Sequence, residues 1–323
     1  MLTTFWSCVL LAGSALALFA ALRTIARRRR WRWLHRAGYV ALVLALPCVG
    51  LGGYLGYRWA AGQPKHKAAV LAEGVTYERF VFTKPRPIVG HLARIDLEKH
   101  SGFVLTPPID TPNGWRYPAA TTTQAARAMD ADLVINGSYS RPAHDRGPLD
   151  YAPHEGDLIE AIGTVVLDGR SFSVSKKNWP SVCVDAAGRV RIGEIDQTTV
   201  LALSGNRWLV RDGVVTPVPE VEDYPTARSA IGLSEDGRYL YFFVVDGKQP
   251  RYSEGMSMTE LAGLMKQAGV HRAVNLDGGG SSTLVYRDPA GDVRVLNRPC
   301  HTQIPGRQRP VANHLGLRFG GSD

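Results

Sequence analysis

The stretch "AVNLDGGGSSTLVY", residues 273–286, joins a short apolar run to an Asn, an Asp and three consecutive glycines. Glycine loses more backbone freedom on folding than any other residue, so three in a row are costly inside an ordered domain. Bare backbone beside a carboxylate also lets a ligand approach main-chain N–H groups, and successive N–H groups can bind an anion. The stretch therefore predicts either a glycine-rich turn between two strands or an anion site beside Asp277.

The residues before this stretch have the pattern of a helix. "SMTELAGLMKQAG", residues 257–269, places Ser257 and Glu260 at capping-box spacing and repeats apolar residues at helical intervals. Gly269 then supplies the usual stop signal. We therefore predict a helix that leads directly into the strand before Asp277.

A second helix–strand unit stands earlier in the chain. "TTTQAARAMDA", residues 121–131, begins with the similar pair Thr121 and Gln124, and "ADLVINGSYS" follows it. The two predicted strands end at Asn136 and Asn275. Because open α/β sheets bind ligands beyond the carboxyl ends of their strands, these two Asn side chains are expected at one ligand site. The alternative is that each Asn caps a turn.

Most of the remaining chain reads as strands, rich in β-branched and aromatic residues and separated by turn signals. Asp236-Gly237 between two such runs predicts a hairpin, and Asp168 and Asp212 are expected in turns for the same reason. The fold class we predict is α+β, a mixed α/β domain dominated by β-sheet with a few helices.

Charge is distributed very unevenly along the chain. Residues 1–67 contain ten of the 38 basic residues and none of the 29 acidic ones, which leaves 28 basic and 29 acidic residues for 68–323. The basic character is thus an N-terminal property, and the larger part of the chain is close to neutral. An Arg cluster can bind nucleic acid, but here it stands between two apolar runs, and we expect no nucleic-acid partner.

Those two runs have the length of membrane spans. Residues 2–22 and 37–57 are uncharged and mostly apolar over 21 residues each, and a helix of that length crosses a hydrocarbon core of roughly 30 Å. The loop 23–36 between them carries seven Arg, and such loops stay on the cytoplasmic side. We expect an uncleaved anchor in the inner or plasma membrane, in contact with lipid, and a domain on the extracytoplasmic side; the alternative is a cleaved signal peptide.

The expected organisation has three parts: a membrane anchor over 1–59, a tether over 60–78 that is small, polar and Pro/Gly-bearing, and one large domain over 79–323. The domain holds two cysteines, Cys183 and Cys300. An extracytoplasmic compartment permits a disulfide between them, and two buried thiols are the equal alternative.

Several common catalytic motifs are absent from the sequence. There is no GxxxxGK[ST], no GxGxxG between a strand and a helix, no CxxC pair, no HExxH and no GxSxG. These absences argue against the usual nucleotide, zinc and serine-hydrolase sites, and nothing in the sequence requires a cofactor.

The chain resembles the phosphodiester glycosidase family over about 79–319. The motifs that carry the resemblance are an Arg-x-Ala-Ile-Gly strand ("RSAIG", 228–232), a Val-Asp-Gly strand exit (245–247), a Ser-x-Gly turn before a Glu-Leu-Ala helix, and the Asn-Leu-Asp-Gly-Gly-Gly-Ser-Ser signature. "VINGSYS" (134–140) is similar to the family's Asn-Gly-aromatic element, although the family more often has Asn-Gly-Gly-Phe, and "RQRPVANHLGL" (307–317) to its closing strand.

The resemblance implies hydrolysis of a glycosyl phosphodiester, between sugar C1 and a phosphate oxygen, with an expected setting in the cell envelope or an exopolysaccharide. A phosphate leaving group is a weak base that needs charge neutralisation more than protonation. Arg228 is therefore the expected phosphate clamp, and Asp277 the base, nucleophile or sugar-hydroxyl ligand. Asp246 and, in the insert 141–157, Glu155 are the further candidate carboxylates.

The remaining expected contacts are to substrate. Asn136 and Asn275 would hold sugar hydroxyls, and the substrate-binding backbone and hydroxyl groups would come from Gly247, Gly278, Gly279, Gly280, Ser281 and Ser282. A divalent cation such as Ca²⁺, bound by Asp246 and Asp277, is conceivable but not indicated by any motif. The alternative functions are a non-catalytic glycan- or phosphate-binding module and an assembly protein of a surface-polysaccharide pathway.

Overall fold

The computed structural model describes residues 61–142, 153–175 and 177–320, together with scattered positions between 17 and 56. The chain forms two compact units, 1–62 and 63–323. The described positions between 17 and 56 are helical. Most of the expected spans 2–22 and 37–57 lie outside the described residues, and none of the helices that are described has the length and apolar character needed to cross a membrane.

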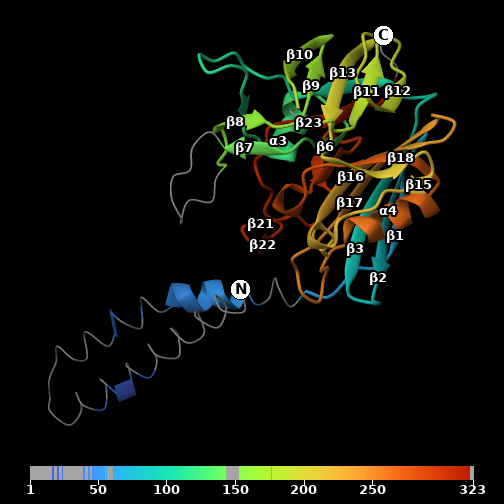
Figure 1. Cartoon of the computed structure of the whole chain (residues 1–323). Coiled ribbons are helices and arrows are strands. Elements are labelled where there is room, and N and C mark those ends of the chain that lie inside the picture. Colours follow the sequence, from blue (N-terminus) through green and yellow to red (C-terminus); the bar gives the residue numbers. More distant parts are fainter. Residues whose placement is uncertain are drawn as a thin grey trace. The chain divides into compact units, whose positions relative to one another are not determined.

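The second unit is built from three larger sheets (Figure 1). The largest has eight strands in the order β1-β2-β3-β17-β16-β18-β14-β15. Their bounds are Lys67–Ala72, Val75–Phe82, Ile88–Asp96, Tyr239–Val245, Arg228–Ser234, Val270–Asn275, Arg207–Arg211 and Val214–Val215.

The described part of the unit also contains two five-stranded sheets and two smaller sheets. One five-stranded sheet has the order β20-β19-β6-β23-β4: Val293–Val295, Leu284–Arg287, Leu133–Asn136, His314–Arg318 and Gly102–Leu105. The other has the order β10-β9-β13-β11-β12: Arg170–Ser173, Val165–Leu167, Thr199–Ser204, Ser181–Asp185 and Val190–Gly193. The smaller sheets pair β5 (Tyr117–Pro118), β8 (Leu158–Ala161) and β7 (Ser140–Pro142), and β21 (Cys300–His301) and β22 (Ile304–Pro305).

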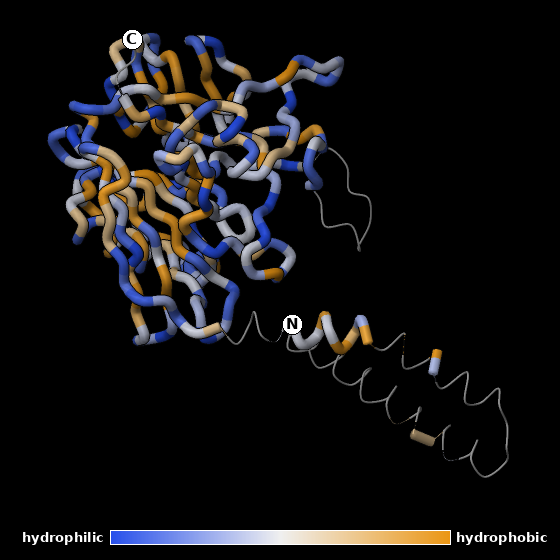
Figure 2. Tube along the Cα trace, turned by 180° about the vertical axis from the view of Figure 1, so that it is seen from behind, coloured by the Kyte–Doolittle hydropathy of each residue, from blue (hydrophilic) through white to orange (hydrophobic). Residues whose placement is uncertain are grey.

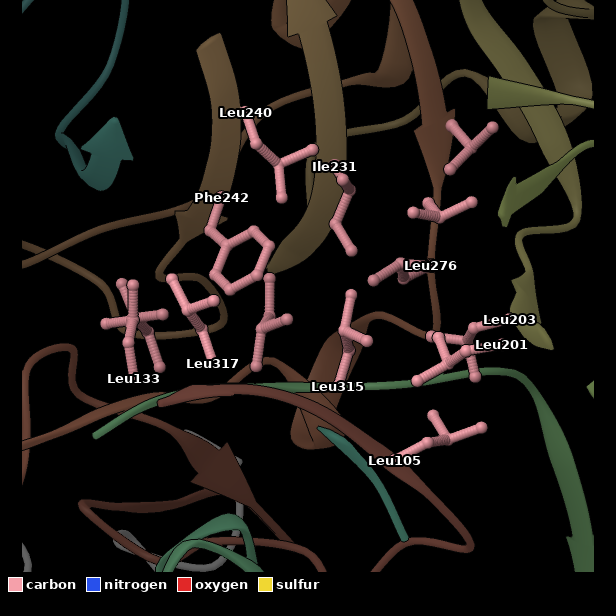
Figure 3. Close-up of a cluster of buried hydrophobic side chains, with 14 of the residues drawn as sticks. Leu105, Leu133, Leu201, Leu203, Ile231, Leu240, Phe242, Leu276, Leu315 and Leu317 are labelled. Atoms are coloured by element: carbon pink, nitrogen blue, oxygen red, sulfur yellow. The ribbon is translucent and has the colours of Figure 1, made fainter. Parts of the chain in front are cut away.

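Strand β17 shows how the sequence creates a layered core. Side chains alternate across a strand, so Leu240 and Phe242 enter the main core between the sheets, whereas Tyr241 and Phe243 enter a second cluster on the opposite face. Figure 3 shows Phe242 pointing towards Leu133 and Leu317 of the facing five-stranded sheet. Because both faces of β17 are covered, its sequence is a continuous apolar run without polar alternation.

Two helices cover the outer faces of the sheets. Helix α4 (Met258–Gln267) packs on the second face of the eight-stranded sheet, and α3 (Thr122–Ala128) packs on the outer face of the sheet that contains β6. Both helices begin with the predicted capping boxes, at Ser257 and Thr121. Figure 2 shows hydrophobic segments mostly in the interior of the folded unit and hydrophilic segments mostly at its periphery. The predicted α+β class, dominated by β-sheet, is confirmed.

Other local predictions can also be compared with the structure. Strands β16 and β17 form the hairpin expected at Asp236-Gly237, and Asp168 and Asp212 adopt positive φ in turns. Cys183 and Cys300 are free, buried thiols, and burial raises the pKa of Cys183 to about 11. The folded unit begins earlier than expected: the segment 60–78 contains β1 and the start of β2, which pair with each other.

Candidate functional site

Asp277 lies between the end of β18 and a short 3-10 turn, η2 (Gly279–Ser281). Its backbone is held on both sides: the Asp277 N–H donates to Gly137 O at 3.2 Å, and its carbonyl accepts from Asn136 Nδ2 at 2.7 Å. Its carboxylate accepts from Ser281 Oγ at 2.6 Å. The local fold thus fixes the carboxylate through two neighbouring segments, and Asp277 as a whole residue is partly exposed.

The proton affinity of this carboxylate is set by competing effects. Burial raises the pKa of Asp277, and this effect outweighs the Ser281 hydrogen bond, the charge of Arg309, the Gly278 N–H and the charge of Lys248, all of which favour the ionised form. A carboxyl group with a raised pKa can exchange a proton closer to neutral pH, as catalytic acids and bases do.

Two cations that the sequence analysis missed lie over the glycines. A Cβ on Gly279 would be 3.3 Å from Lys248 Nζ, and a Cβ on Gly280 would be 3.0 Å from Arg309 Nη2. Arg309 donates to Ser281 Oγ at 3.2 Å. Within the part of the chain that the structure describes, neither cation forms a salt bridge, so neither is paired directly with a carboxylate there.

The glycines allow other groups to approach the backbone closely, but most of their main-chain N–H groups are already engaged within the protein. Gly279 has φ +63, and its N–H donates to Ala227 O at 2.8 Å. The N–H of Ser281 donates to Gly278 O at 3.2 Å, and that of Gly278 bonds the carboxylate of Asp277. Of the four N–H groups at 278–281, only that of Gly280 has no internal acceptor among the described residues, so the expected anion-binding nest is reduced to one main-chain donor.

Arg228 is buried at the start of β16. Its Nε donates to Met256 O at 3.2 Å and its Nη2 to Tyr224 O at 2.8 Å, and burial lowers its pKa. No salt bridge to Arg228 is found among the described residues. Its backbone lies close to the glycine loop, because a Cβ on Gly278 would be 3.9 Å from the Cα of Arg228. Its role as a phosphate clamp stays a prediction; two of its donors are already engaged by carbonyls.

Asn136 and Asn275 do come together around Asp277, although the strands they end are antiparallel to their neighbours. Asn136 is fully buried, and its Oδ1 accepts from Ser229 Oγ and Thr283 N. Its Nδ2 donates to the Asp277 carbonyl, so three of the hydrogen bonds of the Asn136 side chain hold the loop and its surroundings. Direct contact of Asn136 with a sugar stays a prediction that this geometry disfavours.

Asp246 is the centre of a buried polar network. Its Oδ2 accepts from His91 Nε2 at 3.0 Å and Tyr252 Oη at 3.1 Å, and its Oδ1 from Asn297 Nδ2 and Arg298 N, both at 2.9 Å. Asn297 Nδ2 also donates to Ser282 O at 3.0 Å, which connects the network to the glycine loop. Contact of Asp246 with substrate or a metal stays a prediction, and its four internal donors favour a structural role.

The last expected residues are Glu155, Gly247 and Ser282. Glu155 is exposed and accepts from Gln124 Nε2 at 2.8 Å, at the start of α3. Gly247 is buried, and a Cβ at this position would meet Ala227 N at 2.2 Å, so the backbone approach there requires glycine. The Ser282 Oγ is buried, with no partner among the described residues. No group of three or more His, Cys, Asp or Glu in the described part of the chain is placed to hold a metal.

Tyr139 is a further residue that the sequence analysis missed. Asn275 Nδ2 donates to its hydroxyl at 3.2 Å, and its ring meets Trp179 edge-on with centroids 6.1 Å apart. Burial and the charge of Asp277 raise the pKa of Tyr139 to about 12. Tyr139 and Arg309 both lie in motifs that carried the family resemblance, and only their contacts with the Asp277 loop mark them as site residues.

Comparison with known proteins identifies the class. The model of the phosphodiester glycosidase family matches residues 129–318 of the 323-residue chain. Because the match covers more than half of the chain, this protein belongs to the phosphodiester glycosidase family.

Curated relatives are named N-acetylglucosamine-1-phosphodiester alpha-N-acetylglucosaminidase. The human protein is 29% identical over 249 residues, which cover 69% of this chain and 45% of that protein. The mouse protein is 30% identical over 225 residues, which cover 62% and 40% respectively. The match therefore spans less than half the length of these relatives.

Solved structures confirm the fold at lower identity. The catalytic domain of the zebrafish protein of the same name, auto-inhibited by its pro-peptide, has a TM-score of 0.56 and 20% identity, covering 81% of this chain and 92% of that chain. A hypothetical protein from Synechocystis has a TM-score of 0.58 and 14% identity, covering 80% and 64%.

We predict that Asp246→Asn destabilises the folded unit. The substitution replaces one acceptor oxygen by an NH₂ group that faces two donors, and a buried donor left without an acceptor costs about 1–3 kcal/mol. Urea unfolding should show a loss of at least ~2 kcal/mol. Asp292→Asn, at an exposed carboxylate, is the matched control and should change stability by less than ~0.5 kcal/mol. Equal stability of the two variants would contradict the structural role.

We also predict a pH dependence of stability that originates at Asp277. Because its folded pKa is raised above the ordinary value of 3.8, the native state binds the proton more tightly than the unfolded state. Its contribution is therefore most favourable below pH 3.8 and is lost as pH rises to the folded pKa. The unfolding free energy of wild type minus that of Asp277→Asn should fall across this window in urea titrations. A difference that rises with pH would show that the charged partners outweigh burial.

Proposed function

We propose that the chain hydrolyses a glycosyl phosphodiester, with Asp277 acting at the sugar and the cations beside it binding the phosphate. The observation that carries this proposal is one carboxylate of raised pKa, on a partly exposed residue, next to two cations without salt bridges among the described residues, Arg309 and Lys248. The names of the relatives support N-acetylglucosamine-1-phosphodiesters as the first substrates to test.

The chemistry fits this charge distribution. Glycosidases usually need a second carboxylic acid to protonate the leaving oxygen, but a phosphate monoester leaves readily without protonation when its charge is neutralised. Arg309 and Lys248 can supply that neutralisation, and preorganised donors of this kind are usually a large part of catalysis. Asp277 can then act as the nucleophile or as the base that activates water. A site with one available carboxylate is therefore sufficient for this reaction.

We further propose that residues 1–59 anchor the domain in the inner or plasma membrane and place it on the extracytoplasmic side. The support comes from the sequence: two uncharged runs of 21 residues flank a loop with seven Arg. A substrate in the cell envelope or an exopolysaccharide would be accessible to a domain in that position.

Substitutions at the charged groups test the catalytic proposal. On a methyl diester of N-acetylglucosamine-1-phosphate, Asp277→Asn should lower kcat by about 10² to 10⁴, because it removes the acid–base or nucleophilic group. Arg309→Ala should lower kcat/KM by on the order of 10² through loss of phosphate stabilisation.

The matched control is Asp168→Asn, since Asp168 is exposed in a turn with φ +51, a conformation that Asn also adopts. It should leave turnover unchanged. Binding of the diester by the wild-type chain without hydrolysis would instead support a glycan- or phosphate-binding module.

The topology proposal predicts the side on which the C-terminus lies. A reporter that is active only outside the cytoplasm, fused after residue 323, should be active, and replacing the seven Arg of 23–36 by Ser should reduce that activity because the charge bias that orients the spans is lost. A full signal from a cytoplasmic reporter at the same position would contradict the proposal.

A further inference from the structure

The hydroxyl of Tyr139 has a hydrogen-bonding arrangement that the proposed reaction does not yet use. Asn275 Nδ2 lies 2.8 Å from Asn206 Oδ1, 3.1 Å from Leu276 O and 3.2 Å from Tyr139 Oη. The Leu276 carbonyl can only accept, so it fixes the orientation of the Asn275 amide. A reversed amide would place two oxygens 3.1 Å apart.

This orientation determines where the Tyr139 proton goes. An amide nitrogen is a donor only, so Tyr139 Oη accepts from Asn275 and cannot donate to it. Among the described residues, no acceptor for the Tyr139 O–H is present. Since burial and the nearby Asp277 charge raise its pKa to about 12, the phenol keeps this proton at neutral pH.

The position of the hydroxyl is fixed by its surroundings. The ring is partly exposed and packs edge-on against Trp179, with an interplanar angle of 61°. The same segment is tied to the Asp277 loop by the bond from Asp277 N to Gly137 O, at 3.2 Å. Arg309, by contrast, approaches the loop through Ser281 and Gly280, and Lys248 through Gly279. The uncharged donor thus lies with the strand-end residues, and the two cations lie over the glycines.

We propose that the Tyr139 hydroxyl donates a hydrogen bond to one hydroxyl of the sugar bound beside Asp277 and thereby selects the sugar. The proposal rests on the proposed glycosidase function and identifies a specificity-determining residue for it. Sites that hydrogen-bond a substrate hydroxyl discriminate against analogues that lack it, because the site donor is then left without an acceptor.

The test compares wild type with Tyr139→Phe in the full chain. The probes are the methyl diester of N-acetylglucosamine-1-phosphate and its 3-deoxy, 4-deoxy and 6-deoxy analogues. Loss of one neutral hydrogen bond should lower kcat/KM for the parent diester by about 3- to 10-fold. One deoxy analogue should show a similar loss with wild type and no further loss with Tyr139→Phe, as expected for a coupled pair. The control is Tyr239→Phe, which removes a hydroxyl at the first residue of β17, at the end of the strand away from Asp246. This variant should behave as wild type.

Two outcomes would overturn the inference. The first is a Tyr139→Phe variant that matches wild type on every diester, or that loses the same factor on all of them. The second is a clear fall in melting temperature of Tyr139→Phe, which would mean that the hydroxyl donates inward; we expect no fall, because Asn275 keeps two other acceptors.

Calorimetry separates this inference from the proposed function. If wild type does not hydrolyse the diesters, the glycosidase proposal fails, and titration of the same diesters into both proteins still decides the role of Tyr139. The inference is supported if Tyr139→Phe binds the parent diester about 3- to 10-fold more weakly than wild type does, and if the two proteins bind one deoxy analogue equally well. Equal binding of the parent diester, or no binding to wild type, overturns it.

Discussion

The site depends on the close approach of three chain segments to the backbone of Thr226 and Ala227. A Cβ on Gly247 would meet Ala227 N at 2.2 Å, one on Gly255 would meet Thr226 O at 2.2 Å, and one on Gly278 would meet Ala227 O at 2.9 Å. Real Cβ atoms do not tolerate such distances, so glycine is required at these positions. The strand exit of β17, the turn before α4 and the loop after β18 can therefore meet at a single point, which places Asp277 beside the start of β16.

A second layer of polar contacts holds these segments in place. Asp246 stands immediately before Gly247, and its four donors come from β3, the loop after β17 and the segment at 297–298. Asn297 extends the network to the carbonyl of Ser282. Asn136 similarly bridges the Asp277 carbonyl, Ser229 and Thr283. Hydrogen-bonded networks of this kind rigidify a buried region, and here both networks are bonded to main-chain carbonyls of the glycine loop, at Asp277 and Ser282.

Local signals in the sequence predicted local structure well. The capping pairs at Ser257 and Thr121, and the Asp236-Gly237 turn, act over a few residues and were confirmed. The start of the folded unit was harder to predict, because β1 is an edge strand and its pairing with β2 is not apparent from its small, polar neighbours.

Within the site, the residue types were easier to predict than their roles. Asp277 and the glycines are adjacent in sequence, so their importance could be inferred from one stretch. Whether a polar side chain faces a ligand or the interior depends on partners far along the chain. Asp246 accepts hydrogen bonds from His91, which is 155 positions earlier, and from Asn297, which is 51 positions later. Arg309 reaches Ser281 across 28 positions. A single sequence contains no signal for such pairings, which is why the internal partners of Asp246 were not foreseen and both cations, Lys248 and Arg309, were overlooked.

The arrangement around Asp277 also separates two kinds of recognition. Charge is concentrated over the glycines, where Lys248 and Arg309 approach backbone that has no side chains to exclude a ligand. Charge-assisted hydrogen bonds are strong and bind phosphate well, but a phosphate group is common to every glycosyl phosphodiester. Discrimination between sugars must therefore come from uncharged donors and acceptors of fixed geometry. Under the proposed function the phenol of Tyr139 supplies such a group, because the Asn275 amide beside it is held by Leu276 and Asn206. Affinity for the anion and choice of the sugar would then vary independently.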